Sequence, residues 1–125
     1  MKRRILVVED QDDSRRIMRD LLASAGYQVL EARTGADAVK AAETERPDLI
    51  LMDLQLPVID GLEATRRIKA IESLRDTPVI AVTSYALSGD NDKAMAAGCD
   101  SYFSKPVSPR TLLAKINAIL SKPTE

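Results

Sequence analysis

Three short stretches of the chain, residues 5–8, 49–52 and 79–82, are apolar at every position. Unbroken runs rich in Val, Ile and Leu are typical of strands that are buried on both faces of a parallel sheet. Two further candidate strands, residues 28–31 and 101–104, carry polar residues at both ends. The pattern therefore predicts five strands, with the second and the fifth at the edges of the sheet.

Helical periodicity fills the intervals between these strands. Apolar residues recur at helical spacing from Ile17 to Ala25, with Asp12 and Asp13 at the start and Gly26 as the stop. Four more helices are predicted: one from the Thr34 and Asp37 capping box to Pro47, one with Ala64, Ile68 and Ile71 after Gly61, one from Ser88 to Gly98, and one opened by Ser108 and Pro109. We expect Asp12, Asp13 and Asp60 to act as helix caps.

The regular alternation of strands and helices indicates an α/β fold, in which helices cover both faces of a doubly wound, five-stranded parallel sheet. If the second and fifth strands are edges, and sequential strands are usually neighbours, the simplest strand order is 2-1-3-4-5. That order reverses between strands 1 and 3. Ligands of open α/β sheets bind at such a switch point, beyond the carboxyl ends of the strands.

The length and composition of the chain exclude several classes of function. With 125 residues the chain is long enough for one domain, which we expect to span residues 1–121 before a short polar tail at 122–125. Its 18 Lys and Arg balance 19 Asp and Glu, and 3% of residues are aromatic, so direct binding to nucleic acid or membrane is not expected. A single cysteine, Cys99, and no apolar run long enough for a signal peptide favour a cytoplasmic location.

Chemically distinctive residues, most of them polar, follow the predicted strands at the expected binding edge. They are Glu9 and Asp10 after the first strand, Asp53 after the third, Thr83 and Ser84 after the fourth, and Lys105 and Pro106 after the fifth. Neighbouring strands lie about 4.8 Å apart, so Asp10 and Asp53 should face each other with Glu9 beside them. Such carboxylates repel one another unless a cation intervenes, and a site without His or Cys suits Mg²⁺.

A metal, an ammonium group and a hydroxyl together are typical of a site for a phosphoryl group on or near a carboxylate. A carboxylate can itself accept that group and form an aspartyl phosphate. We expect Asp53 to be the acceptor because it lies centrally, between the acidic end of the first strand and the positions of Thr83 and Lys105.

Across essentially its full length the chain resembles the receiver domains of two-component response regulators, the CheY-like superfamily. The resemblance rests on Val-Val-Glu-Asp at 7–10, Leu-Met-Asp-Leu-Gln-Leu-Pro at 51–57 with Asp-Gly at 60–61, Val-Thr-Ser at 82–84, and Ser-Lys-Pro at 104–106. The chain is similar both to stand-alone regulators of the cell-division type and to the receivers of hybrid histidine kinases. The resemblance also implies a flavodoxin-like fold with the strand order 2-1-3-4-5.

The resemblance implies a role for each matched residue. Asp53 would receive a phosphoryl group from a phosphohistidine, and Mg²⁺ would be bound by Asp10, Asp53 and the backbone carbonyl of Gln55, with Glu9 acting mostly through water. Lys105 would pair with the phosphoryl oxygens. Pro106 would follow a cis peptide that orients this lysine. Thr83 and Tyr102 would switch conformation together, Ser84 would line the site, and Gln55 and Tyr85 match variable positions that tune the lifetime of the phosphoryl group.

The implied function is a phosphorylation-dependent signalling switch without an output domain of its own, rather than a metabolic enzyme. A histidine kinase or histidine phosphotransfer protein would be the donor. A downstream protein would read the face formed by the fourth helix, fifth strand and fifth helix, and the chain would be a monomer or a weak phosphorylation-dependent dimer.

Two other classes compete with this interpretation. Asp10-Gln11-Asp12 after an apolar strand looks like the nucleophile motif of haloacid-dehalogenase-type phosphatases, with Asp53 then a metal ligand. A flavin-binding, flavodoxin-like module would need a phosphate loop after the first strand, where residues 9–13 are instead mostly acidic and would repel phosphate.

Overall fold

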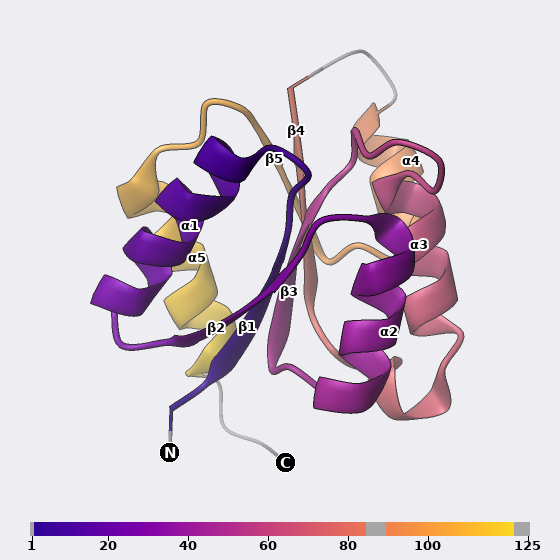
Figure 1. Ribbon diagram of the computed structural model, residues 1–125, viewed down its shortest axis with the longest axis horizontal. Helices are drawn as coiled ribbons and strands as arrows, with labels where there is room; N and C mark the ends of the chain where they lie inside the picture. The colour runs from indigo at the N-terminus through magenta and orange to yellow at the C-terminus, as the bar shows by residue number, and fades with distance from the viewer. Residues whose placement is uncertain (1, 85–89, 122–125) are drawn as a thin grey trace.

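In a computed structural model of the chain, residues 2–84 and 90–121 are described (Figure 1). The elements in chain order are β1 (Arg4–Val8), α1 (Asp12–Ser24), β2 (Gln28–Ala32), α2 (Gly35–Glu45), β3 (Leu49–Asp53), α3 (Gly61–Lys69), the 3₁₀ turn η1 (Glu72–Leu74), β4 (Val79–Thr83), α4 (Asp90–Ala97), β5 (Ser101–Ser104) and α5 (Pro109–Leu120). Strands and helices alternate as the sequence predicts.

The strands form one parallel sheet in the order β2-β1-β3-β4-β5, which confirms the predicted topology. β3 and β4 are buried at every position, whereas the edge strands β2 and β5 are partly exposed. The register pairs Val8 with Met52, and Asp53 with Val82. The carboxyl ends of β1, β3 and β4 therefore meet at one edge of the sheet.

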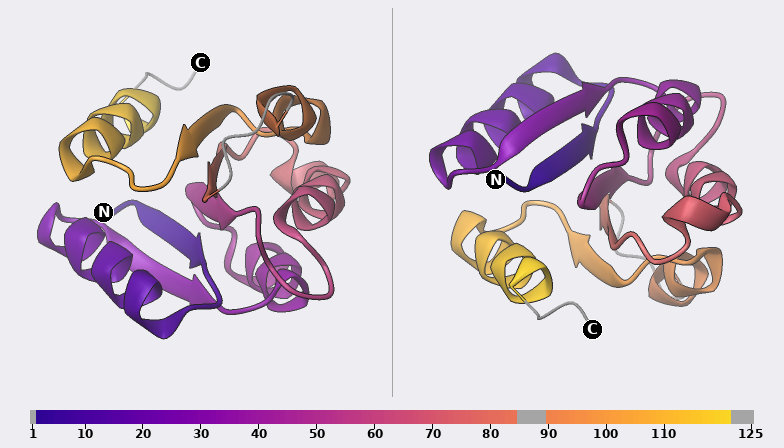
Figure 2. Two further views of the ribbon diagram at one scale, coloured as in Figure 1. Left: turned by 90° about the horizontal axis from the view of Figure 1, so that it is seen from above. Right: turned by 90° about the horizontal axis from the view of Figure 1, so that it is seen from below.

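Each strand of the sheet contributes alternate side chains to two separate apolar cores, because successive residues point to opposite faces. Ile5, Val7 and their counterparts on β3 and β4 pack with Leu22 of α1 and Ile116 of α5. Leu6, Val8 and their counterparts pack with α2, α3 and α4. Figures 1 and 2 show these two helical layers on either side of the sheet.

The predicted caps are largely present. Thr34 accepts a hydrogen bond from the amide of Asp37, Asp60 from that of Glu63, and Ser108 from that of Thr111. The prediction that Asp12 and Asp13 cap α1 is wrong, because both lie inside its first turn and the residue before them is the N-cap. There they still stabilise the helix, since carboxylates favour its positive end.

Three further details differ from the expectation or go beyond it. Ile71 lies outside α3, because its extended backbone turns the chain into η1. Ile17, expected on the buried face of α1, is 69% exposed. The predicted start of the fourth helix at Ser88 falls outside the described residues, and the described helix begins at Asp90.

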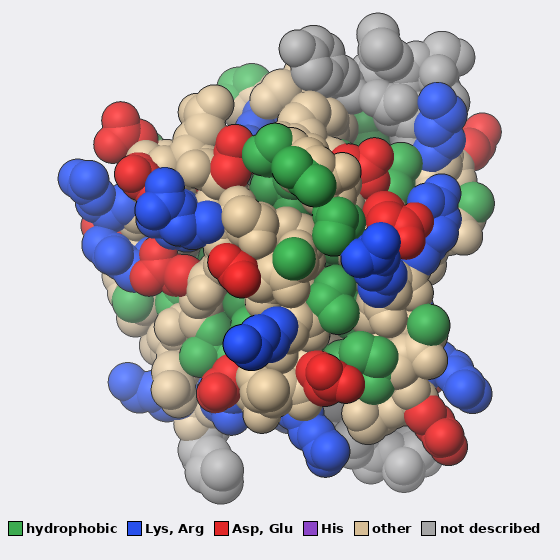
Figure 3. Space-filling model, turned by 45° about the vertical axis from the view of Figure 1, so that its right-hand side comes forward, with side chains coloured by type: hydrophobic (Ala, Val, Ile, Leu, Met, Phe, Trp, Pro, Cys, Tyr) green, Lys and Arg blue, Asp and Glu red, His purple; other side chains and the backbone are tan. Residues whose placement is uncertain are grey.

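The surface fits the balanced composition. On the face shown in Figure 3, acidic and basic side chains are interspersed with apolar ones, and neither sign of charge dominates. Within residues 2–84 and 90–121, no helix is long and apolar enough to cross a membrane.

Candidate functional site

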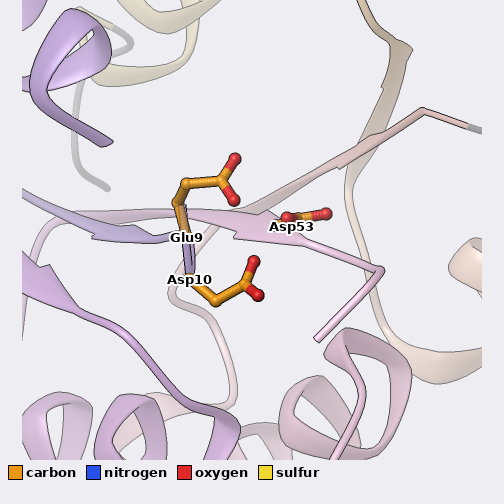
Figure 4. Close-up of side chains that lie close together, drawn as sticks. All are labelled: Glu9, Asp10 and Asp53. Atoms are coloured by element: carbon orange, nitrogen blue, oxygen red, sulfur yellow. The ribbon is translucent and has the colours of Figure 1, made fainter. Parts of the chain in front are cut away.

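Three carboxylates converge where β1 and β3 end. Each of Glu9, Asp10 and Asp53 places a carboxylate oxygen within 4.8 Å of the others (Figure 4). Glu9 and Asp53 are buried, at 6% and 5% exposure, and Asp10 is intermediate. The arrangement follows from the register, since Val8 and Met52 are paired and each precedes an acidic residue. The predicted acidic cluster is therefore present in the structure.

Lys105 brings a positive charge to two of these carboxylates. Its Nζ lies 2.6 Å from Glu9 Oε1 and 3.6 Å from Asp53 Oδ2. The residue directly follows β5, and its amide donates to the Thr83 carbonyl at 2.6 Å. The Lys105–Pro106 peptide is cis, as the resemblance implied.

The charges at the site perturb one another. Burial and the neighbouring Glu9 carboxylate raise the pKa of Asp53 to about 7. Burial also disfavours ionised Glu9, but hydrogen bonds with Lys105 and Asp53 outweigh it and lower the pKa of Glu9. The pKa of Lys105 is raised, because both carboxylates overcome its partial burial. Glu9 is thus the ionised partner of Lys105, and Asp53 carries excess negative charge that a proton or a cation can neutralise.

The acidic cluster has the donor set of a hard-cation site. It offers carboxylate oxygens from three residues, and oxygen ligands suit Mg²⁺ rather than a softer transition metal. The surplus charge on Asp53 supplies a physical reason for a divalent ion to bind there.

Gln55 connects the acidic cluster to the end of β4. Its backbone amide donates to Asp53 Oδ1 at 3.0 Å. Its side-chain Oε1 accepts from the Ser84 amide at 2.8 Å, and its Nε2 donates to Thr83 Oγ1. Thr83 is fully buried, whereas Ser84 is exposed. The resemblance implied a role only for the backbone carbonyl and a variable side chain at this position, so the side-chain contacts were not expected from the sequence.

Tyr102 lies apart from the other predicted site residues. It belongs to β5, pairs with Ala81 in register, and packs against the core beneath α2, α3 and α4. The structure thus brings Glu9, Asp10, Asp53, Gln55, Thr83, Ser84 and Lys105 together and places Tyr102 toward α4 and α5.

Arg15 also supports the site, although sequence analysis did not select it. Its Nη1 donates to the Glu9 carbonyl at 3.1 Å, its Nη2 to Asp12 at 2.8 Å and its Nε to Glu31 at 3.0 Å. The guanidinium therefore fastens the loop after β1 to both α1 and β2. Nothing in the sequence distinguishes it from the neighbouring Arg16.

A groove of about 480 Å³ leads to the carboxylates from the side of α1. Its apolar wall includes Ile17, Met18, Pro106 and Val107, and Glu9 and Asp53 also line it. The exposure of Ile17 is explained by this position, because the side chain lines the groove instead of the core.

The comparison with protein families decides the class of this site. The model for the response regulator receiver domain matches residues 5–117. The chain belongs to this family. The receiver domain is accordingly a phosphoacceptor switch of two-component signalling, a class that works with a phosphodonor kinase and a downstream partner.

Individual relatives agree with this assignment. The chain is 41% identical over 120 residues to the polar-differentiation response regulator DivK of Brucella anthropi, covering 96% of this chain and 98% of that protein. It is also similar to the receiver domain of a sensor histidine kinase from Pseudomonas aeruginosa, with a TM-score of 0.90, 38% identity, and coverage of 98% and 100% of the two chains. That structure has a magnesium ion coordinated in the active site cleft.

A more distant solved structure has the same fold. The chemotaxis protein CheY4 of Vibrio cholerae has a TM-score of 0.90 at 27% identity, with 95% of this receiver domain and 99% of that chain covered. The flavodoxin-like sheet is shared throughout, and the carboxylates of this receiver domain lie at its topological switch point.

Proposed function

We propose that Asp53 is the residue that accepts the phosphoryl group. One Asp53 oxygen forms a bond to phosphorus while the phosphorus–nitrogen bond of a phosphohistidine breaks, and the electron pair of that bond stays on the imidazole ring. The observation that carries the proposal is the central position of Asp53, with Glu9, Asp10 and Lys105 around its carboxylate. Asp53 lines the groove beside α1, so a donor bound in this groove would lie next to its carboxylate.

Mg²⁺ fits the same residues. We infer that the carboxylates of Asp10 and Asp53 and the carbonyl of Gln55 would bind it, with Glu9 acting through water. Bound there, the ion would neutralise charge on these carboxylates and on the phosphoryl oxygens. Support comes from the acidic cluster, from the excess charge on Asp53, and from the magnesium ion in the similar Pseudomonas aeruginosa receiver.

The phosphodonor would dock over the apolar groove beside α1. Ile17 is 69% exposed there, and Met18, Pro106 and Val107 continue the apolar surface up to Asp53. A helix that carries a phosphohistidine, from a histidine kinase or a histidine phosphotransfer protein, could bury this surface while presenting its ring to the carboxylate. Apolar contacts would bind the donor protein, and the acidic cluster would be the place where the phosphoryl group is transferred.

The response to phosphorylation would begin at Thr83 and Lys105. A hydrogen bond to a charged group contributes roughly 1.5–3 kcal/mol, whereas reversing a population from 1:99 to 99:1 needs about 5.5 kcal/mol. Thr83 alone is therefore insufficient, so Lys105 and the amide of Ser84 must contribute, or the shift stays partial until a partner binds.

The readout surface would be the α4–β5–α5 face. A second groove, of about 780 Å³, lies there and is lined by Met95, Tyr102, Phe103, Lys115 and neighbouring residues. Tyr102 lines this groove from β5, which pairs with β4, the strand that ends at Thr83. Met95 is 47% exposed. We infer that a downstream protein binds this groove. Action in the cytoplasm, a monomeric or weakly dimeric state, and the absence of metabolic turnover stay predictions from the sequence.

Phosphorylation by a small donor tests the role of Asp53. Purified protein is incubated with Mg²⁺ and acetyl phosphate, and intact-mass spectrometry measures the gain of one phosphoryl group. We expect the gain in the wild type and in the matched control Asp76→Asn, an exposed aspartate outside the site, and none in Asp53→Asn. Equal gain in Asp53→Asn, or loss of the label only in Asp10→Asn, would contradict the proposal, and the second result would favour the phosphatase-type alternative.

A further inference from the structure

The Gln55 side chain forms hydrogen bonds with two groups at the end of β4. Its carboxamide reaches from the loop after β3 to the Ser84 amide, 2.8 Å from Oε1, and to Thr83 Oγ1. The same residue donates its backbone amide to Asp53 Oδ1 at 3.0 Å. The backbone of Gln55 is thus bonded to the Asp53 carboxylate, and its side chain is bonded to both Thr83 and Ser84.

The orientation of the carboxamide is fixed by chemistry. A backbone N–H can only donate, so the amide oxygen of Gln55 must face Ser84. The NH₂ group then faces Thr83, whose hydroxyl oxygen accepts. Thr83 is fully buried, and a hydrogen bond shielded from water is stronger than an exposed one. The contact therefore restrains the rotation of Thr83 about its χ1 bond.

Ser84 lines the same groove as Asp53, and the register pairs Asp53 with Val82, the residue before Thr83, so a phosphoryl group on Asp53 would come close to both groups. The Ser84 amide has one proton, so it cannot bond fully to Gln55 Oε1 and to a phosphoryl oxygen at once. The Thr83 hydroxyl would likewise have to turn from Gln55 toward the new charge. Phosphoryl binding and the Gln55 contacts are therefore in competition.

We propose that Gln55 is a positioning residue that latches Thr83 and Ser84 in the unphosphorylated arrangement and must release them when Asp53 is modified. The inference rests on the proposed function of Asp53 and Thr83 and adds a residue that opposes the switch. Removing the latch should favour the modified state, since two neutral hydrogen bonds no longer have to be broken. The usual strength of two such bonds corresponds to about thirtyfold in an equilibrium constant.

Beryllofluoride, which binds carboxylates as a non-covalent mimic of a phosphoryl group, is the probe for this test. The Gln55→Met variant keeps the length of the side chain and removes both hydrogen bonds, and Gln28→Met, at an exposed position of β2, is the matched control. Fluorine NMR titrations with Mg²⁺ present measure the affinity. We expect about thirtyfold tighter binding for Gln55→Met, by the same hydrogen-bond accounting, and wild-type affinity for Gln28→Met.

A second measurement uses the wild type alone and does not depend on how the variant folds. The Gln55 side-chain NH₂ signals and the Ser84 amide signal are followed by nitrogen–proton NMR during the titration. Both should shift as the probe binds, because the carboxamide leaves its partners. In the free Gln55→Met variant, the Ser84 amide should exchange with solvent faster than in the wild type.

The outcomes separate this proposal from the one on which it rests. If the wild type does not bind beryllofluoride in the presence of Mg²⁺, the proposed function of Asp53 fails and the latch fails with it. If the wild type binds and Gln55→Met has equal or weaker affinity, or the Gln55 NH₂ signals do not move, only the latch is overturned. Weaker binding would show that the carboxamide supports the bound group instead of opposing it.

Discussion

The raised pKa of Asp53 makes a quantitative prediction about stability without metal. Burial and Glu9 raise this pKa from 3.8 to about 7. The folded protein therefore holds a proton that the unfolded chain releases as the pH rises through about 4. The contribution of Asp53 to stability is therefore greatest below that pH, falls between about pH 4 and 7, and is level above it. Since one pKa unit corresponds to about 1.4 kcal/mol, ionising Asp53 in the folded state lowers stability by about 4 kcal/mol.

Asp53→Asn removes this penalty while keeping the shape of the side chain. Lys105 remains paired with Glu9 at 2.6 Å, so the substitution leaves no unpaired ammonium group. We expect the metal-free variant at pH 8 to be more stable than the wild type by about 2–4 kcal/mol, or roughly 4 °C in Tm for each kcal/mol. The difference should shrink by about half at pH 5, where the folded wild type keeps its proton.

Urea unfolding followed by far-ultraviolet circular dichroism is the appropriate assay, because the chain has no Trp. Measurements in EDTA at several pH values from 5 to 8.5 are compared for the wild type, Asp53→Asn and the exposed control Asp76→Asn. Mg²⁺ should then stabilise the wild type more than Asp53→Asn, since ligands stabilise only the state that binds them. Equal stability of wild type and Asp53→Asn at pH 8, or a difference that does not depend on pH, would refute the reasoning.

Three more substitutions test the surroundings of the site. Gly61→Ala would place a Cβ 2.3 Å from the Asp53 carbonyl, so we expect a loss of about 1–3 kcal/mol in urea unfolding and slower labelling by acetyl phosphate; an unchanged midpoint would contradict this close approach. Val58 has a φ of 67° and a fully exposed side chain, so Val58→Asn should raise the unfolding free energy by about 1 kcal/mol, whereas a loss would show that Val58 is not strained. Arg15→Met frees the Glu9 carbonyl and should weaken Mg²⁺ binding about tenfold by calorimetry, with Arg16→Met, whose side chain is exposed, as the control that keeps wild-type affinity.

The sheet and the acidic cluster could be predicted because both follow from simple patterns. Apolar runs identify buried strands, and the residues after those runs must meet at one edge once the order 2-1-3-4-5 is fixed. The contacts of Gln55 were beyond this reasoning, because they depend on the path of a loop and on one rotamer. The exposure of Ile17 was not predicted for a different reason. Helical periodicity shows that a side chain faces apolar surroundings, but not whether these are a core or a groove.

Helix boundaries show the resolution limit of sequence patterns. Asp12 and Asp13 carry the signal of a helix start, yet the cap is one residue earlier, and a shift of one residue is enough to change their role. Ile71 continues the apolar spacing of α3 by one more turn, but the chain has already left the helix. Spacing identifies the helices, whereas their ends depend on local backbone geometry.

The division of the interior into two cores affects how such a domain can change. Leu22 and Ile116 lie on one side of the sheet, and Ala38 and Ile68 lie on the other. Substitutions that share no neighbours usually have additive effects on stability, so each helical layer can accumulate changes without constraining the other. The layer with α1 borders the proposed donor groove, whereas the proposed readout groove lies between α4 of one layer and α5 of the other. Duplicated copies of such a domain could therefore change their output through α4 without disturbing the donor groove, while the acidic edge between the layers stays the same.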